Sequence, residues 1–182
     1  VLTAADIPGV NDCGSIIHDD PILCDGEIRY VGQPLFAVIA RSRDAARRAA
    51  ALAKAAATIS ELAPVLTPRK AHELGQYVMP PMHLERSTRE GGARAAMDAA
   101  PHRLKGSFDV GGQEQFYLEG QISYATPKED RAVHIHCSTQ HPSEMQHLVA
   151  HALGVASHSV HVECRRMGGG FGGKESQSAL FA

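Results

Sequence analysis

Apolar and polar residues alternate in two short segments of the second half of the chain. Residues 132–137 and 159–164 both follow the two-residue period of a strand that is buried on one face. Between them, apolar residues recur at the three- and four-residue spacing of an amphipathic helix. Proline favours the first turn of a helix and glycine its end, so we expect this helix to begin at Pro142 and to stop at Gly154.

The first third of the chain has a second set of elements, centred on an alanine-rich segment. Alanine is the best helix former, and Ser42 precedes residues 44–54 as a candidate N-cap. Short apolar runs at 35–40 and 58–62 flank this helix and predict two strands. Together these elements predict a β-α-β unit, followed by a short helix that Thr67 caps.

Residues 76–89 interrupt this regularity. They contain a double proline and have no clear period, which is typical of a linker. After the linker, a second alanine-rich segment predicts a helix that runs to about Ala100. Segments at 103–108 and 115–125 predict further strands. The linker therefore separates two groups of helices and strands.

The composition is that of a folded, soluble protein. Hydrophobic residues make up 43 % of the 182 residues and charged residues 21 %, which excludes a disordered or fibrous chain. The net charge of −2 gives no reason to expect nucleic acid or an anionic membrane as a partner. No apolar run approaches the roughly 20 residues that span a bilayer. The chain starts without a leader-like segment and ends in apolar residues, so we expect one piece of a longer cytoplasmic protein.

The cysteines and histidines form no recognisable metal-binding motif. The four cysteines are irregularly spaced, which favours reduced thiols over a zinc site or a disulfide framework. His134 and His136 share one face of a predicted strand, and His147 and His151 share one face of the predicted helix. Neither pair has a third ligand at a suitable spacing, so we interpret both pairs as the solvated faces of amphipathic elements.

Glycine occupies five of the six positions 168–173, between the last predicted strand and a helix expected to begin near Glu175. Such a run is costly unless the backbone needs a positive φ or a ligand must approach it closely. Backbone N–H groups in this setting favour an anionic or electron-rich ligand, and a glycine-rich turn without a ligand is the alternative. Residues 168–174 also fit the pattern of a nucleotide-binding loop. Glu175 then stands where Mg²⁺ needs Ser or Thr, which disfavours a triphosphate.

Three segments together resemble a known family. They are, in chain order, GGQEQFYLE at 111–119, STQ at 138–140 and RRMGGGFGGKE at 165–175. Their order and spacing are similar to the molybdenum-cofactor domain of the xanthine dehydrogenase and aldehyde oxidase family. VLTAADIPGV at 1–10 and YVGQP at 30–34 are similar to the α/β hammerhead domain that precedes it in that family.

The resemblance implies an α+β fold with two domains. Residues 1–75 are expected to form an incomplete α/β hammerhead domain that lacks its N-terminal strands, and residues 76–89 to form a linker. Residues 90–182 are expected to form the first lobe of a molybdenum-cofactor-binding domain, which is truncated. Within the first motif, Gln113 and Glu119 are assigned a structural role.

The resemblance also assigns candidate site residues. Gln140 matches a glutamine that hydrogen-bonds an oxygen ligand of molybdenum without touching the metal itself. Phe171, with its neighbours Gly170 and Gly172, matches a loop whose backbone approaches the metal and its pterin. Glu175 matches the position at which purine hydroxylases bind the substrate heterocycle through a carboxyl group. Outside these motifs the same residues are typical of a strand-end amide, a core aromatic and an acid in the first turn of a helix.

The activity that the resemblance implies is the hydroxylation of hypoxanthine and xanthine to urate. A molybdenum-bound hydroxide attacks the ring carbon, hydride passes to a sulfido ligand, and [2Fe-2S] centres, FAD and NAD carry the electrons away. This chain has no cysteine cluster, flavin-binding segment or catalytic base, so these groups are expected on other domains or subunits of an oligomer. We expect the 182 residues alone to be inactive and to retain no cofactor.

Two alternatives remain open at the level of the sequence. The first is a hydroxylase of aldehydes or of other nitrogen heterocycles in the same family, which keeps Gln140 and Phe171 but has a different substrate pocket. The second is a non-enzymatic α/β module, in which the glycine loop has no ligand.

Overall fold

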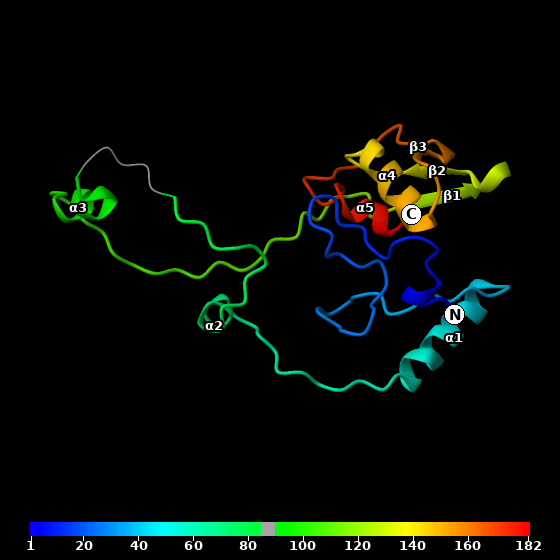
Figure 1. The fold of residues 1–182 in the computed structure, drawn as a ribbon, viewed down its shortest axis with the longest axis horizontal. Helices are drawn as coiled ribbons and strands as arrows, with labels where there is room; N and C mark the ends of the chain where they lie inside the picture. The colour runs from blue at the N-terminus through cyan, green and yellow to red at the C-terminus, as the bar shows by residue number, and fades with distance from the viewer. Residues whose placement is uncertain (85–89) are drawn as a thin grey trace. The chain divides into compact units, whose positions relative to one another are not determined.

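The computed structural model describes residues 1–84 and 90–182, which fall into two compact units. One unit combines Val1–Ala57 with Gln113–Ala182, and the other is Thr58–Gly112. The helices are α1 (Arg43–Ala56), α2 (Pro68–Glu73), α3 (Gly92–Asp98), α4 (Pro142–Leu153) and α5 (Gln177–Leu180) (Figure 1). The strands are β1 (Ser123–Pro127), β2 (Val133–Cys137) and β3 (Val160–Glu163), and single 3₁₀ turns occur at Ala4–Asp6, Glu129–Arg131 and Ser157–Ser159.

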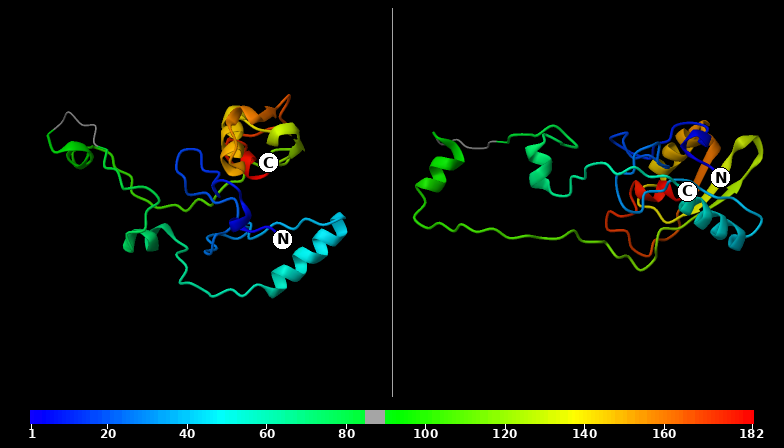
Figure 2. Two further views of the ribbon diagram at one scale, coloured as in Figure 1. Left: turned by 45° about the vertical axis from the view of Figure 1, so that its right-hand side comes forward. Right: turned by 90° about the horizontal axis from the view of Figure 1, so that it is seen from below.

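The three strands form one sheet in the order β1-β2-β3, and this sheet is the centre of the first unit. β1 is antiparallel to β2, whereas β3 is parallel to β2. A parallel pair needs a crossover, and α4 supplies it between β2 and β3. Figure 2 shows α4 and α5 beside the sheet. The α+β architecture expected from the sequence is therefore present.

The core lies between α4 and the inner face of the sheet. It is built from the alternating apolar residues of the strands and the apolar stripe of the helix: Ile135, Cys137, Met145, Val149, Ala150 and Val160. Ala179 of α5 packs against the same cluster. The two-residue and three-to-four-residue periods in the sequence therefore meet in one buried layer, as expected for a sheet covered by a helix.

The ends of α4 are where the sequence predicts them. Pro142 occupies the first turn, and Gly154 ends the helix in the left-handed region at φ +63°. Two other predicted caps also form, because Ser42 Oγ accepts a hydrogen bond from Ala45 N and Thr67 Oγ1 accepts one from Lys70 N. The last helix, α5, begins two residues after the predicted Glu175, at Gln177.

Several predicted strands are wrong. Residues 35–40 make only one antiparallel bridge, between Leu2 and Ala37, and residues 58–62 and 103–108 form no strand. The predicted strand at 115–125 is reduced to β1, which starts at Ser123. A strand exists only where a neighbour supplies a series of backbone hydrogen bonds. Among the described residues, the run at 35–40 has such bonds only at Ala37, and the runs at 58–62 and 103–108 have none. The predicted β-α-β unit around α1 is therefore not formed.

The second unit is mainly irregular, with α2 and α3 as its only described regular elements. The predicted linker at 76–89 falls within this unit, and its last residues, 85–89, lie outside the described residues. The domain boundaries set from the sequence stay predictions. Several apolar side chains are almost fully exposed here, Leu104 and Phe108 among them.

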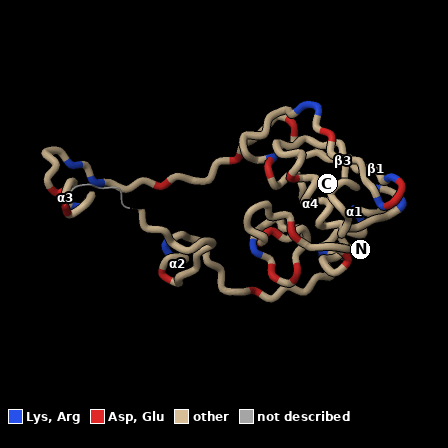
Figure 3. Tube along the Cα trace, turned by 45° about the horizontal axis from the view of Figure 1, so that its top comes forward, with Lys and Arg blue, Asp and Glu red and all other residues tan. Residues whose placement is uncertain are grey.

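Acidic and basic residues are interspersed along the chain and do not gather by sign (Figure 3), in keeping with the net charge of −2. None of the described helices has both the length and the apolar character required to cross a bilayer. All four cysteines are free thiols, and Cys13 and Cys137 are buried.

Candidate functional site

The glycine loop and the segment after β2 meet at one edge of the sheet. β2 and β3 are parallel, so the chain leaves both strands at the same edge, and the two connections that follow lie next to each other. Gln140 N donates a 2.8 Å hydrogen bond to the carbonyl of Lys174. Gln140 Oε1 accepts from Gly172 N at 2.9 Å and from Lys174 N at 3.3 Å. Gln140 therefore anchors the loop through both its backbone and its side chain.

This pair of hydrogen bonds fixes which way the Gln140 amide points. Two backbone donors require the oxygen on the loop side, because an NH₂ group cannot accept them. The Gln140 NH₂ is then directed away from those donors and makes no hydrogen bond with any residue in 1–84 or 90–182. The site thus presents an uncharged hydrogen-bond donor to whatever occupies the space beside the loop.

Gly170 and Gly172 permit this arrangement for different reasons. A Cβ on Gly170 would lie 2.5 Å from Gln140 Oε1, which is closer than van der Waals contact allows. Only glycine at this position therefore lets the amide reach the loop. Gly172 has open space around it but a φ of +91°, which L side chains rarely adopt. Gly170 is therefore needed for the close approach of the Gln140 side chain, and Gly172 is needed for the positive φ of the backbone.

Phe171 lies between these glycines in the left-handed region, with φ +51°. For a bulky side chain this conformation is strained by roughly 1–2 kcal/mol. Its ring is not buried in the core, since 76 % of the residue is exposed. The interpretation of Phe171 as a core aromatic is therefore wrong. Burial of the ring does not explain why Phe171 adopts its strained backbone conformation.

A buried lysine ties the loop to an earlier segment of the chain. Lys174 is fully buried, and its Nζ donates to Glu119 Oε2 and to Ser138 Oγ, both at 2.9 Å. Glu119 Oε2 also accepts from Gly168 N at 2.9 Å and from Ser138 Oγ at 2.6 Å. These donors lower the pKa of Glu119 from 4.5 to about 2, and the Gly168 N–H has the largest effect.

The environment of Lys174 also bears on the nucleotide-loop pattern. In a phosphate-binding loop this lysine must reach the ligand. Here its ammonium group is paired with Glu119 and lies 4.7 Å from the centre of the Tyr117 ring. Sequence reasoning gave Glu119 a structural role only, and the structure shows which contacts carry that role. Two residues 55 positions apart offer no local signal that they pair.

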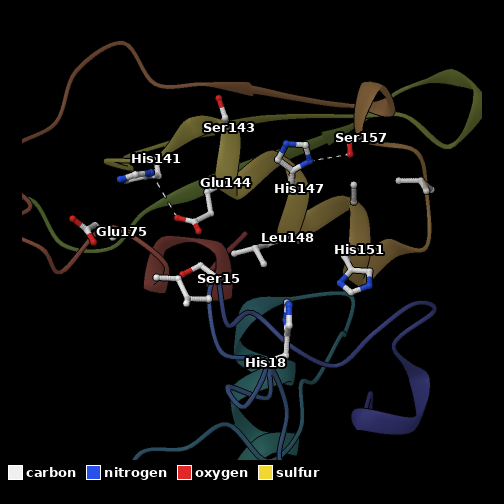
Figure 4. A pocket seen from close by; sticks show the side chains of 13 residues that line it. Ser15, His18, His141, Ser143, Glu144, His147, Leu148, His151, Ser157 and Glu175 are labelled. Carbon is white, nitrogen blue, oxygen red and sulfur yellow. Dashed lines mark hydrogen bonds and ion pairs between the residues drawn. The ribbon is translucent and has the colours of Figure 1, made fainter. Parts of the chain in front are cut away.

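Glu175 comes directly after Lys174, whose carbonyl accepts the hydrogen bond from Gln140 N. Its exposed side chain lines a cavity of about 720 Å³, together with residues from α4 and from the Ser15–His18 region (Figure 4). His141 and Glu144 lie along the same wall, with His141 Nδ1 3.7 Å from Glu144 Oε2. Among the described residues, no hydrogen bond or ion pair joins Glu175 to Gln140 or Phe171. The structure therefore brings together Gln140, Gly170, Phe171 and Gly172, and it places the Glu175 side chain on the wall of the neighbouring cavity.

The residues around Gln140 fit the molybdopterin group that the motifs imply. The Gln140 NH₂ has no protein partner in the described parts of the chain, and the adjoining loop exposes backbone instead of a side chain at Gly172. An uncharged donor beside an open backbone suits an oxygen-rich, anionic cofactor.

Comparison with protein families agrees with this geometry. Residues 71–182 match the family described as "Molybdopterin cofactor-binding domain". Residues 1–57 match the family described as "Aldehyde oxidase and xanthine dehydrogenase, a/b hammerhead domain". The chain therefore belongs to the xanthine dehydrogenase and aldehyde oxidase family, and its second part is a molybdopterin cofactor-binding domain.

Individual relatives from this family have different enzyme names. The chain is 40 % identical over 173 residues to a xanthine dehydrogenase of Drosophila pseudoobscura pseudoobscura, covering 94 % of this chain and 12 % of the relative. It is 37 % identical over 182 residues to aldehyde oxidase 2 of Cavia porcellus, covering 99 % and 13 %. It is 36 % identical over 174 residues to nicotinate hydroxylase hnxS of Emericella nidulans, covering 94 % and 13 %. The chain thus spans about an eighth of the length of these relatives.

Proposed function

We propose that this chain is the part of a purine-hydroxylating molybdenum enzyme that positions the molybdopterin cofactor. The observation that carries the proposal is the Gln140 amide, whose oxygen is held by Gly172 N and Lys174 N and whose NH₂ has no protein partner among the described residues. When bound, the cofactor would supply oxygen-atom transfer and accept the two electrons of the oxidation.

The chain's own residues would bind and orient this group. Gln140 Nε2 would donate a hydrogen bond to an oxygen of the molybdenum centre without adding charge there. Phe171 and the adjacent Gly170 and Gly172 would let the backbone lie against it, because two of the three positions carry no side chain. The strained φ of +51° at Phe171 supports a functional reason for the loop conformation.

A purine substrate, hypoxanthine or xanthine, is the finer part of the proposal and depends on Glu175. Glu175 is exposed and lines the 720 Å³ cavity, so its carboxyl group is free to accept a hydrogen bond from a ring N–H. Similarity alone does not select this substrate, since relatives named for xanthine, aldehyde and nicotinate are 36–40 % identical to the chain. The substrate assignment must therefore be tested by substituting Glu175.

The proposal also includes the remaining parts of the enzyme. Iron–sulfur centres, FAD and the catalytic base are proposed on other domains or subunits, within an oligomeric cytoplasmic enzyme that uses NAD. The relatives are about eight times as long as the matched segment, which leaves room for these parts. The 182-residue chain by itself is then expected to be inactive and to retain no cofactor.

The deciding experiment compares Glu175→Ala with the wild type in the complete enzyme, on hypoxanthine, xanthine and a set of aldehydes. Purine turnover should fall at least about tenfold more than aldehyde turnover, because only the purine uses the carboxyl group. Glu129→Ala is the matched control, since Glu129 lies in a distant 3₁₀ turn. Equal losses on both substrate classes contradict the purine assignment, and a wild-type preference for aldehydes would favour an aldehyde hydroxylase of the same family.

A further inference from the structure

Four side chains with metal-binding atoms lie on the face of the sheet opposite to α4. The core residues Ile135 and Val160 point to the helix, so their neighbours along each strand point to the other face. In the parallel register, His134 pairs with His161 and His136 pairs with Glu163. Paired residues on adjacent strands project to the same side, which places three histidines and one glutamate in a two-by-two group.

The distances within this group suit a single small cation. Glu163 Oε2 lies 3.2 Å from His134 Nε2 and 3.6 Å from His136 Nδ1. All three ligand atoms lie within 4.8 Å of one another. Four ligands bonded tetrahedrally to zinc at ~2.0–2.1 Å are ~3.3 Å apart, so two of the three separations are already close to this value.

The environment of His134 supplies an independent reason to expect a ligand. Its Nε2 is shielded from solvent and makes no hydrogen bond among the described residues, although Glu163 Oε2 lies 3.2 Å away. A buried polar atom without a partner costs free energy, which a bond to a cation removes. The His134 and His136 rings are 4.3 Å apart between centres, and their ligand atoms lie within 4.8 Å of each other.

Neighbouring residues hold the carboxylate in position. The guanidinium of Arg165 hydrogen-bonds Glu163 Oε1, which leaves Oε2 on the side of the two imidazoles. Outer contacts of this kind orient ligands in known metal sites. The His161 ring lies 4.6 Å from that of His134, so it borders the three ligand residues without being one of them as the side chains stand.

We propose that His134, His136 and Glu163 form a binding site for a late first-row divalent cation such as Zn²⁺, with His161 or water as the fourth ligand. Two imidazoles and a carboxylate are a donor set that such cations favour. The site lies on the outer face of β2 and β3 and contains none of the residues assigned to the molybdenum centre. The two histidines of β2 are recognisable from the sequence because they share one strand face, whereas Glu163 is not, because it comes from another strand.

The test titrates Zn²⁺ into the metal-free full chain and follows the heat of binding and the imidazole NMR signals. One equivalent should bind, and the signals of His134 and His136 should shift. Glu163→Gln should weaken binding at least about tenfold, and the double variant His134→Ala/His136→Ala should abolish it. The matched control His147→Ala/His151→Ala removes the helical pair instead and should bind as the wild type does.

Three outcomes overturn the proposal. They are no stoichiometric binding by the folded wild type, loss of binding only in the His147→Ala/His151→Ala control, and Zn²⁺-induced shifts confined to histidines outside β2. The NMR measurement on the wild type needs no substitution, so it decides the question even if a variant fails to fold.

Discussion

Gln140 Oε1 accepts a 2.9 Å hydrogen bond from the backbone N–H of Gly172, which is 32 residues further along the chain. One side-chain oxygen thereby holds the loop, while the NH₂ group of the same side chain remains available for a ligand. In the proposed function, support of the loop and contact with the ligand use different atoms of one amide, so substitutions can remove one role and keep the other.

Gln140→Glu should separate these roles. A carboxylate still accepts the hydrogen bonds from Gly172 N and Lys174 N, so the free energy of unfolding should change by less than about 1 kcal/mol. The donor is lost, however, and turnover by the complete enzyme should fall about 10–100-fold. Gln140→Leu is the comparison, because it removes both roles and should also cost about 1–3 kcal/mol of stability. Unchanged turnover in the folded Gln140→Glu enzyme would contradict the assigned contact.

Gly170→Ala should destabilise the loop through a steric clash. The added Cβ would lie 2.5 Å from Gln140 Oε1, and forcing the two apart should cost about 1–3 kcal/mol in denaturant unfolding. Gly172→Ala meets no neighbour within 4 Å and should cost only the ~1–2 kcal/mol of its φ of +91°. Gly120→Ala, with neither constraint, is the control and should be neutral. If Gly170→Ala is as stable as that control, the close approach does not exist in solution.

Lys174→Met should lower the free energy of unfolding by about 1–3 kcal/mol, since it removes two hydrogen bonds and leaves Glu119 without its ammonium partner. The methionine fills similar volume, so the loss reports polar contacts more than packing. Lys128→Met, at an exposed lysine, should stay within about 0.5 kcal/mol of the wild type. A double-mutant cycle with Glu119→Gln should give a coupling energy, and strict additivity would show that the pair does not interact.

The stability of the first unit should depend on pH through Glu119. Its pKa is about 2 in the folded chain and close to 4.5 when unfolded, so the folded state favours the ionised form. The stabilisation is therefore fully present above about pH 4.5 and is lost as the pH falls toward 2. Urea unfolding of the wild type and of Glu119→Gln across this range should show a steeper loss in the wild type. Parallel curves would mean that Glu119 does not titrate as described.

The elements that the sequence predicts correctly are those with local signals. α4 has its proline, its glycine and a complete apolar stripe, and β2 and β3 each alternate over their full length. The runs at 35–40 and 58–62 also look like strands, but strand formation depends on a partner that no local pattern reveals. Gln140 and Gly172 are found from the sequence because each lies in a recognisable motif. The pairing of Glu119 with Lys174 is not found, because no local pattern reveals a partner 55 residues away.

The contacts that build the glycine loop are all distant in sequence, with 32 residues between Gln140 and Gly172 and 55 between Glu119 and Lys174. Closing such intervals early is entropically unfavourable, so non-local contacts of this kind form late on a folding pathway. The crossover β2-α4-β3 carries both halves of the site to one edge of the sheet, so the loop contacts depend on its packing. A substitution that loosens the packing of α4 on the sheet should therefore disturb the glycine loop without touching it, because one crossover holds both halves of the site.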